Sequence, residues 1–274
     1  MTINCKGNLI DLASPKVMGI LNITPDSFYS ESRKTSLTAL LKSAEEMLEQ
    51  GATFLDVGGT STRPGADEIS EIEELDRVVP AIEAILKNFP ECIISIDTFR
   101  SKVAAEALNS GAAIVNDISA GNLDKKMLET VAKYQVPYIM MHMRGTPQTM
   151  KNLNEYKDLT QDIIFYFSEK VRAARALGIN DIIIDPGFGF SKNIQQNFEL
   201  LSSLKKFKNL KLPILAGLSR KSTIYKTLDC SPKEALNGTT VLNTMAIANG
   251  ADILRVHDVK EAMETVKLMS QLTF

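Results

Sequence analysis

Polar side chains recur where short apolar runs of this chain end. Ile182, Ile183 and Ile184 lead into Asp185, and a loop with two glycines follows at residues 186–190. A β-branched run of this length, closed by proline and glycine, is typical of a strand buried on both faces. Asp185 is therefore expected at the carboxyl end of a buried strand, beside a loop whose glycines allow the backbone to approach a ligand.

Eight apolar runs lead in this way into polar groups, and the carboxyl ends of parallel strands gather on one face when a sheet closes into a barrel. The side chains that would meet there are Asn22, Asp56, Thr62, Arg63, Asp97, Asn116, His142, Asp185, Lys221, Arg255 and His257. Acids and amides can pair with a ligand edge rich in N–H donors, while arginines and a histidine can hold an anion. These residue types together predict a site for a heterocycle and a phosphate group.

Each of these side chains also has a structural interpretation. A strand-end aspartate often caps the next helix or ties down a loop. Asp117 should face away from the candidate amide that precedes it, so we interpret it as structural, and the role of Asp56 stays open. His142 fits a buried core histidine as well as a ligand. His257 is the better candidate, because its spacing of two from Arg255 places both on one face of a strand.

The elements that would position these residues can be read from the same runs. Strands are predicted at residues 17–21, 54–57, 93–97, 114–117, 138–141, 182–185, 213–216 and 253–256, with amphipathic helical patterns between them. Four glycines follow helical stretches, as expected for left-handed helix ends: Gly51, Gly111, Gly178 and Gly250. Capping-box patterns predict helix starts at Ser70 with Glu73, and at Ser231 with Pro232 and Glu234.

Eight strand-then-helix units in order predict an α/β fold, a single-domain (β/α)8 TIM barrel. The chain has 274 residues, and such a barrel takes about 250. We therefore assign residues 1–274 to one domain, with the barrel at 17–274. Residues 1–12, with Lys6, Gly7 and Asn8 in the middle, are predicted to form a short N-terminal β-hairpin.

Composition excludes several classes of protein. The net charge of −2, with both signs mixed along the chain, argues against a nucleic-acid surface. The N-terminus lacks the pattern of a signal peptide, and no apolar run reaches the roughly 18 residues of a membrane span. Cys5, Cys92 and Cys230 are far apart, which suits free thiols in a reducing compartment. The sequence therefore predicts a cytoplasmic protein that binds neither nucleic acid nor membrane.

Three other kinds of site are disfavoured. Gly187 and Gly189 lack the third glycine of a dinucleotide fingerprint, because Lys192 occupies its place. Ser219 and Ser222 could be placed with a histidine in a hydrolase triad, but no Gly-x-Ser-x-Gly elbow occurs. Two histidines and three scattered cysteines cannot form a dedicated zinc cage. A metal here would be a hard ion held partly by substrate phosphates, which fits Mg2+.

Seven motifs, in order along nearly the whole chain, resemble those of the dihydropteroate synthase family. They are VMGILNITPDSF at 17–28, GGTSTRPG at 58–65, SIDT at 95–98, VND at 115–117, DPGFGF at 185–190, GLSRKS at 217–222 and RVHD at 255–258. The first two are far more specific than a barrel fold, which hosts many chemistries. The resemblance implies the condensation of 6-hydroxymethyl-7,8-dihydropterin diphosphate with p-aminobenzoate, which gives 7,8-dihydropteroate and diphosphate in folate biosynthesis.

The resemblance also implies roles for individual residues. The pterin would be bound by Asp97, Asn116, Ile118, Met140, Asp185, Lys221 and Arg255. The diphosphate would lie against Asn22, Thr62, Arg63, Arg255 and His257, with Mg2+ bound through Asn22. The p-aminobenzoate site would comprise Phe28, Thr62, Arg63, Pro64, Phe190, Lys221 and Ser222, the last near the start of a helix. The catalytic residues would be Arg63, Lys221, Arg255 and His257.

Some features differ from the family or leave alternatives open. After Phe28 the family usually has an acid and two glycines, whereas this chain continues from Tyr29 to Arg33 as YSESR. The family is commonly dimeric, so the resemblance implies a homodimer. One alternative is a methyltransferase barrel that passes a methyl group from a reduced folate to a corrinoid partner, which has no use for Arg63. Another is a non-catalytic pterin-binding partner subunit, in which Arg63, Lys221 or Arg255 would be expected to be lost.

Overall fold

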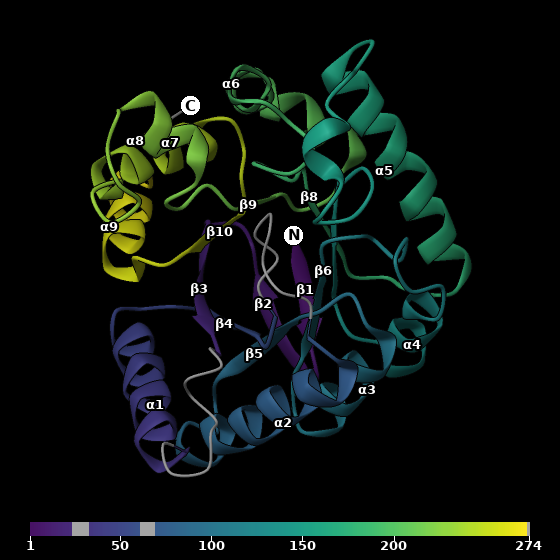
Figure 1. The fold of residues 1–274 in the computed structure, drawn as a ribbon, viewed down its shortest axis with the longest axis vertical. Helices are drawn as coiled ribbons and strands as arrows, with labels where there is room; N and C mark the ends of the chain where they lie inside the picture. The colour runs from purple at the N-terminus through teal and green to yellow at the C-terminus, as the bar shows by residue number, and fades with distance from the viewer. Residues whose placement is uncertain (24–32, 61–68, 273–274) are drawn as a thin grey trace.

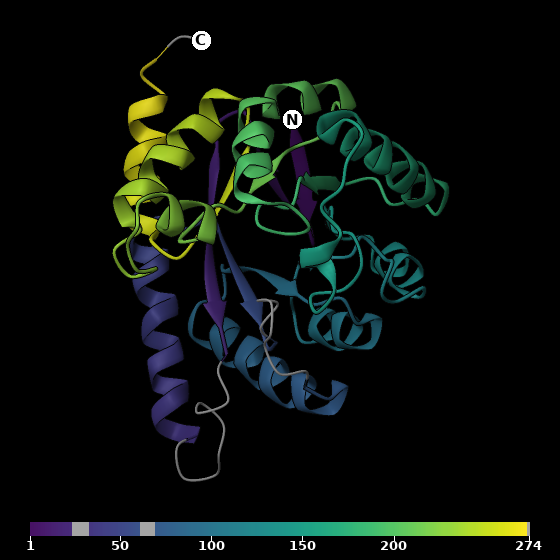
Figure 2. The same cartoon turned by 45° about the horizontal axis from the view of Figure 1, so that its top comes forward.

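Parallel strands form the centre of the molecule in the computed structural model, which describes residues 1–23, 33–60 and 69–272. The strands of this sheet are β3 (Lys16–Asn22), β4 (Phe54–Gly58), β5 (Ile93–Asp97), β6 (Ile114–Asp117), β7 (Tyr138–Met141), β8 (Ile182–Asp185), β9 (Leu215–Ala216) and β10 (Ile253–Val256). Among the described residues they pair in the order β8-β7-β6-β5-β4-β3-β10-β9, and every pair is parallel. Figure 2 shows the neighbouring arrows of β3 and β4 pointing the same way.

The two ends of this sheet meet, which closes the barrel. Ile184 of β8 pairs in parallel with Ile214, and its N–H donates to the carbonyl oxygen of Pro213 at 2.9 Å. Asp252 N and Ile253 N both donate to the Ile214 carbonyl, at 2.8 and 3.1 Å, on the other side. The predicted strand at 213–216 is therefore present, but only Leu215–Ala216 is a regular strand.

Helices surround the strands in a ring (Figure 1). Those in the described parts of the chain are α1 (Arg33–Glu49), α2 (Glu71–Asn88), α3 (Ser101–Asn109), α4 (Met127–Tyr134), α5 (Leu159–Ala176), α6 (Ile194–Ser202), α7 (Ser222–Thr227), α8 (Leu236–Ala248) and α9 (Val259–Met269), with short 3-10 turns η2 (Met150–Asn152) and η3 (Leu204–Leu210). No helix within the described ranges is both long and apolar enough to cross a membrane. The predicted (β/α)8 barrel is confirmed.

The four predicted glycine helix ends share one geometry. Gly51, Gly111, Gly178 and Gly250 all have positive φ, from +82° to +111°. The residue after each glycine donates its N–H to the carbonyl five positions earlier, as in Ala52 to Met47 at 2.9 Å and Ile179 to Ala174 at 3.1 Å. This is the bond that satisfies the last carbonyls of a helix. The chain then enters the next strand directly.

One of the two predicted helix starts is confirmed and the other is displaced. Ser70 accepts a hydrogen bond from the N–H of Glu73 at 3.1 Å and caps α2. Ser231 does not begin a helix, because α8 starts only at Leu236. Half of the predicted box does form, since Ser231 N donates to Glu234 Oε2 at 2.9 Å, but it closes a turn before the helix.

The N-terminal hairpin closes one end of the barrel. Strands β1 (Thr2–Cys5) and β2 (Asn8–Asp11) pair antiparallel through a turn in which Lys6 and Gly7 have positive φ. Ile3, Cys5 and Leu12 pack with the residues that fill this end of the barrel, a cluster called the lower core: Met18, Phe54, Ala113, Ile114, Ile139, Ile183, Leu215 and Ile253. The opposite end, where the strands finish, stays available for polar side chains.

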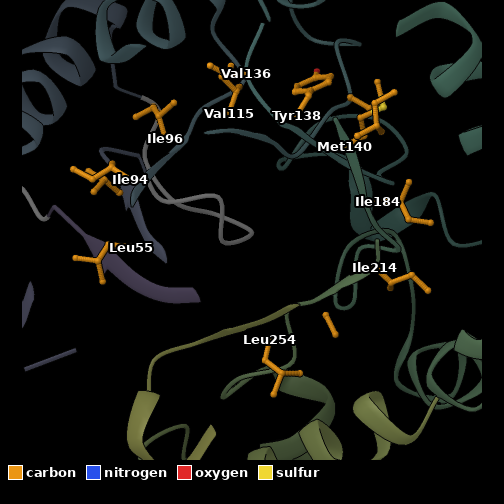
Figure 3. Packing of buried hydrophobic residues seen from close by; sticks show 14 of the residues in the cluster. Leu55, Ile94, Ile96, Val115, Val136, Tyr138, Met140, Ile184, Ile214 and Leu254 are labelled. Carbon is orange, nitrogen blue, oxygen red and sulfur yellow. The ribbon is translucent and has the colours of Figure 1, made fainter. Parts of the chain in front are cut away.

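A second cluster lies between the strands and the helices. It takes alternate residues of successive strands, and Figure 3 shows these side chains arranged in a ring: Leu55, Ile94, Ile96, Val115, Tyr138, Met140, Ile184 and Leu254. These side chains are all fully buried. Strand residues of the other parity therefore face the barrel interior.

Candidate functional site

The carboxyl ends of the neighbouring strands β4, β5 and β6, and of β8 beyond β7, bring buried polar side chains into the barrel interior. Asp56, Asp97, Asn116 and Asp185 are each at most 8% exposed. Asp56 has the same strand parity as Phe54 in the lower core, which places its side chain inside the barrel. With the residues contributed by β10 and by the loops after β8 and β9, they form what we call the barrel-end site.

Arg255 joins two of these acids. Its Nε donates to Asp56 Oδ2 at 2.6 Å, and its Nη2 donates to Asp97 Oδ2 at 2.6 Å. Asn116 Nδ2 donates to the same Asp56 oxygen at 3.0 Å. These residues come from β4, β5, β6 and β10, so the closure of the barrel builds this network.

The network leaves acceptor capacity unused. Asp56 Oδ1 and Asp97 Oδ1 are buried and have no hydrogen-bond partner within the described part of the chain. Burial raises the pKa of Asp97 to about 7, with Arg255 opposing and Asp56 adding to the shift. Although burial lowers the pKa of Arg255, the charges of Asp56 and Asp97 raise it above its usual range. A ligand edge with N–H donors would satisfy both open oxygens.

Asp185 and Lys221 lie on the other side of the barrel end. Gly187 N donates to Asp185 Oδ1 at 2.7 Å. A Cβ at Gly217 would lie 3.7 Å from Lys221 Nζ and 4.0 Å from Asp185 Oδ2, so both side chains flank this glycine. Burial raises the pKa of Asp185 and lowers that of Lys221 to about 8. The pair places an acceptor and a donor at one edge of the site.

Lys221 is also held by the loop after β8. Its Nζ donates to the carbonyl oxygen of Phe188 and stands 5.0 Å from the centre of the Phe190 ring. Ser222, directly after Lys221, is the half-buried first residue of α7. Phe190, Lys221 and Ser222 are therefore adjacent, as predicted for one part of the site.

His257 follows β10 and pairs with Ser219. Ser219 Oγ is 3.0 Å from His257 Nδ1, and the His257 N–H donates to the same oxygen at 3.2 Å. The neighbouring Arg220 and Asp258 form a two-pronged ion pair with distances of 2.8 and 2.7 Å. This pair ties the loop after β9 to the end of β10, which positions His257 at the rim.

Asn22 ends β3 with an exposed side chain. A Cβ at Gly58 would lie 3.7 Å from both Asn22 Oδ1 and Asp97 Oδ2, so the amide stands at the rim above Asp97. The described residues contain no group of three or more His, Cys, Asp or Glu side chains able to hold a metal ion.

The apolar wall differs from the prediction in one residue. Ile118 packs with Met141, Met143 and Met150, and Phe190 lies against this cluster. Met140 is fully buried in the cluster that faces the helices, on the same strand face as Tyr138, so the structure does not bring it to the site. Its neighbour Met141 points instead toward the barrel interior, because adjacent strand residues point to opposite faces.

Two polar residues have structural positions. Asp117 accepts hydrogen bonds from Ser119 N, Gly121 N and the Tyr138 hydroxyl, each at 2.7 Å, and it faces away from Asn116 as predicted. His142 is 2% exposed, and its ring packs edge-on against Tyr166 with centroids 4.9 Å apart. These contacts support the interpretation of His142 as a buried core histidine.

Part of the predicted site cannot be placed. Phe28, Thr62, Arg63 and Pro64 lie outside the described residues. The structure assigns Asp56 to the site, a role that the sequence left open. The sequence feature that could have indicated this role is its spacing of two from Phe54 and from Gly58, which places it on the inward face of β4. It also adds Lys192, a buried lysine behind the loop of residues 186–191, for which the sequence carried no functional signal.

Comparison with known proteins agrees with this geometry. A family model described as "Pterin binding enzyme" matches residues 18–257. Dihydropteroate synthase of Escherichia coli strain K12 is 43% identical over 271 residues, which cover 98% of this chain and 95% of that protein. The Yersinia pestis dihydropteroate synthase solved with a sulfonamide drug superposes with a TM-score of 0.93 at 41% identity, and 99% of this chain and 98% of that one are covered. The Xanthomonas albilineans enzyme in complex with 7,8-dihydropteroate has a TM-score of 0.88 at 33% identity, with 99% and 98% covered.

Proposed function

This chain belongs to the dihydropteroate synthase family of pterin-binding enzymes, and we propose that its barrel-end site joins 6-hydroxymethyl-7,8-dihydropterin diphosphate to p-aminobenzoate. The products would be 7,8-dihydropteroate and diphosphate. The observation that carries this assignment is the buried network of Asp56, Asp97, Asn116 and Arg255, in which two carboxylate oxygens have no partner among the described residues. Such an arrangement suits the amino and ring N–H edge of a pterin.

The pterin would lie inside the barrel end. Asp97 and Asn116 would read one part of its polar edge and Asp185 another, while Lys221 would donate to a ring acceptor. Ile118 and Met141 supply the apolar wall that a flat ring requires. Arg255, already held by two carboxylates, presents its planar guanidinium for stacking and reaches toward the rim.

The diphosphate would leave at the rim. Its departure breaks the bond between the pterin methylene carbon and oxygen, and the electron pair goes to the leaving diphosphate. Arg255 and His257 would stabilise that developing charge, together with Arg63 and Thr62. The cation that remains is shared with the electron-rich pterin ring, so no protein nucleophile is needed. The neutral amine of p-aminobenzoate then forms the new carbon–nitrogen bond and loses a proton.

The p-aminobenzoate would enter last, between Phe190, Lys221 and Ser222. Lys221 and the first N–H groups of α7 suit its carboxylate, and the Phe190 ring suits its aromatic face. Phe28, Thr62, Arg63 and Pro64 are proposed to complete this half of the site.

Mg2+ is the proposed metal. Asn22 offers a hard amide oxygen, and one such ligand fits an ion that keeps several waters and is otherwise held by substrate phosphates. When bound, the ion would neutralise negative charge on the leaving diphosphate.

We also propose a cytoplasmic homodimer that works on small-molecule substrates and does not bind nucleic acid. The three cysteines are free thiols, in agreement with a reducing compartment. Val241 and Met245 of α8 are 52% and 47% exposed, and they are candidates for a contact between subunits. Sedimentation of the protein and of a Val241→Glu variant would test this contact.

Product formation tests the function directly. The purified protein would be incubated with the dihydropterin diphosphate, p-aminobenzoate and Mg2+, and dihydropteroate would be followed by chromatography while each component is omitted in turn. We expect product only when all three are present. A protein that binds the pterin but makes no product would instead be the non-catalytic partner subunit.

The order of binding is a second test. We expect calorimetry to detect p-aminobenzoate binding only when Mg2+ and diphosphate are already present, because the leaving group is proposed to complete its site. Equal binding to the free protein would contradict the ordered scheme.

A further inference from the structure

Behind the barrel-end site lies a buried lysine that the proposed chemistry does not use. Lys192 is 9% exposed. Its Nζ is 2.9 Å from the carbonyl oxygen of Gly187, 2.9 Å from that of Phe190 and 3.1 Å from His142 Nδ1. Three polar contacts at one buried amine indicate a specific position.

These contacts match the donors of an ammonium group. Burial lowers the pKa of Lys192 and the charge of Asp185 opposes this shift, while two carbonyls and an unprotonated ring nitrogen match the three N–H donors of an ammonium group. Burial, aided by the charges of Lys192 and Arg144, lowers the pKa of His142 to about 2, which leaves its ring neutral. His142 then carries its proton on Nε2 and accepts at Nδ1.

The two carbonyls belong to the loop that faces the site. From the site side, Lys221 Nζ donates to Phe188 O and stands over the Phe190 ring. Lys192 binds the carbonyls of Gly187 and Phe190, and Phe190 N donates to Gly187 O at 3.1 Å. Both lysines thus hold carbonyls of one loop, an arrangement that we call the clamp.

We infer that Lys192 is a positioning residue that holds the Phe190 ring against Lys221 at the p-aminobenzoate end of the site. The inference rests on the proposed function. The backbone of Asp185 is held by the sheet, because it pairs with Met141 and its carbonyl accepts from His142 N at 2.9 Å, and its side chain keeps one contact with the loop, from Gly187 N at 2.7 Å. Loss of Lys192 should therefore disturb one substrate more than the other.

Steady-state kinetics of Lys192→Met test this difference. We expect the KM for p-aminobenzoate to rise about tenfold, since the two carbonyls lose their shared donor, while the KM for the pterin diphosphate stays within about twofold. Lys206→Met, a matched change at an exposed lysine before Phe207, should alter neither. Should Lys192→Met fail to fold, Lys192→Gln keeps a polar group in the pocket, but its amide ends one atom short of the lysine Nζ and cannot reach both carbonyls, so it should show the same split. Equal changes in both KM values would overturn the inference.

A double-mutant cycle separates positioning from general destabilisation. If Lys192 acts through Phe190, adding Lys192→Met to Phe190→Ala should raise the KM for p-aminobenzoate no further. If instead the two substitutions raised the KM for p-aminobenzoate independently, so that their fold-changes multiplied in the double variant, the inference would be overturned.

Amide hydrogen exchange gives a readout that does not need turnover. In Lys192→Met, the Phe190 amide should exchange at least about tenfold faster, while the amide of His142, which donates to the end of β8, should not change. Unchanged exchange at Phe190 would overturn the role of Lys192 in the loop. Absence of product from the unsubstituted protein would overturn only the proposed function.

Discussion

The charged side chains in the barrel interior are paired, and the charge of each depends on its partner. Arg255 binds Asp56 and Asp97 while all three are largely buried, so each carboxylate offsets the cost of removing the guanidinium from water. One oxygen of each acid remains open within the described chain. With both acids ionised, this cluster carries one net negative charge, and its open oxygens suit a ligand with N–H donors.

Asp185→Asn tests the acceptor edge at this scale. The amide replaces one acceptor oxygen with a donor, so we expect the Kd for a pterin to rise at least about tenfold, the loss of one charge-assisted hydrogen bond. Calorimetry with 6-hydroxymethylpterin measures the change. Asp229→Asn, at an exposed residue with positive φ that asparagine also accepts, is the control. Unchanged affinity in Asp185→Asn would remove this residue from the pterin site.

Pterin binding should depend on pH with two limbs. Burial raises the pKa of Asp97 to about 7 and lowers that of Lys221 to about 8. Ionised Asp97 accepts from the ligand, so affinity should rise as the pH increases through about 7. Lys221 donates only when protonated, so affinity should fall again above about 8. Calorimetry across this range checks both limbs, and Asp97→Asn should lose the lower one.

The raised pKa of Asp97 makes protein stability change with pH in the opposite direction to pterin affinity. The folded protein binds this proton more tightly than the unfolded chain, so the contribution of Asp97 is fully present below its unfolded pKa, near 4. That contribution is lost as the pH rises through about 7. The measurement is the free energy of unfolding of the native protein and of Asp97→Asn between about pH 4 and about pH 7. If the native protein lost no stability relative to the variant over this range, the raised pKa of Asp97 would be contradicted.

Among the elements, the loop after β8 has the strictest backbone requirement. Gly187 has φ +75°, and a Cβ there would lie 2.1 Å from the carbonyl oxygen of His142. This close approach lets Gly187 N reach Asp185 and lets its carbonyl reach Lys192. The glycine is therefore needed for contact as well as for conformation.

Two glycine substitutions separate these causes. Gly178→Ala, at φ +82° with open space around it, should cost about 1–2 kcal/mol in the free energy of unfolding, the strain of a left-handed residue. Gly187→Ala adds a collision with backbone and should cost at least about 3 kcal/mol. Denaturant unfolding of both variants measures the difference. Similar costs would show that the loop moves aside easily.

For the whole molecule, the two ends of the barrel have separate tasks. The hairpin seals one end with Ile3, Cys5 and Leu12, while the acids and cations gather at the other. Stability and chemistry can therefore be changed independently at the two ends.

Substitutions in the hairpin test this separation. Ile3→Ala removes a side chain that is 2% exposed and should cost about 2–5 kcal/mol, whereas Leu9→Ala, at 71% exposure, should change stability by at most about 0.5 kcal/mol. The KM values of folded Ile3→Ala protein should equal those of the parent. Thermal unfolding and steady-state kinetics provide the two measurements, and altered KM values would connect the two ends.

Local sequence was sufficient for the barrel, its hairpin and most of its polar face. Apolar runs of strand length and glycine helix ends are local signals, and they placed each strand to within a few residues. Strand parity also separated Asn116 from Asp117 correctly. Ser231 shows where local signals fail, because its capping partner Glu234 is present but closes a turn, and the helix begins at Leu236.

Only the tertiary structure decided which side chains meet. Met140 and Met141 are the same residue type on one strand, so residue type cannot distinguish them. The register of β7 in the closed barrel turns Met140 toward the helices and Met141 toward the site. Asp56 joins Arg255 across 199 positions of sequence because β4 and β10 flank the same strand. Lys192 has no motif of its own, and its three partners converge only when the loops after β7 and β8 pack together. Such contacts depend on the curvature of the barrel, which no local pattern encodes.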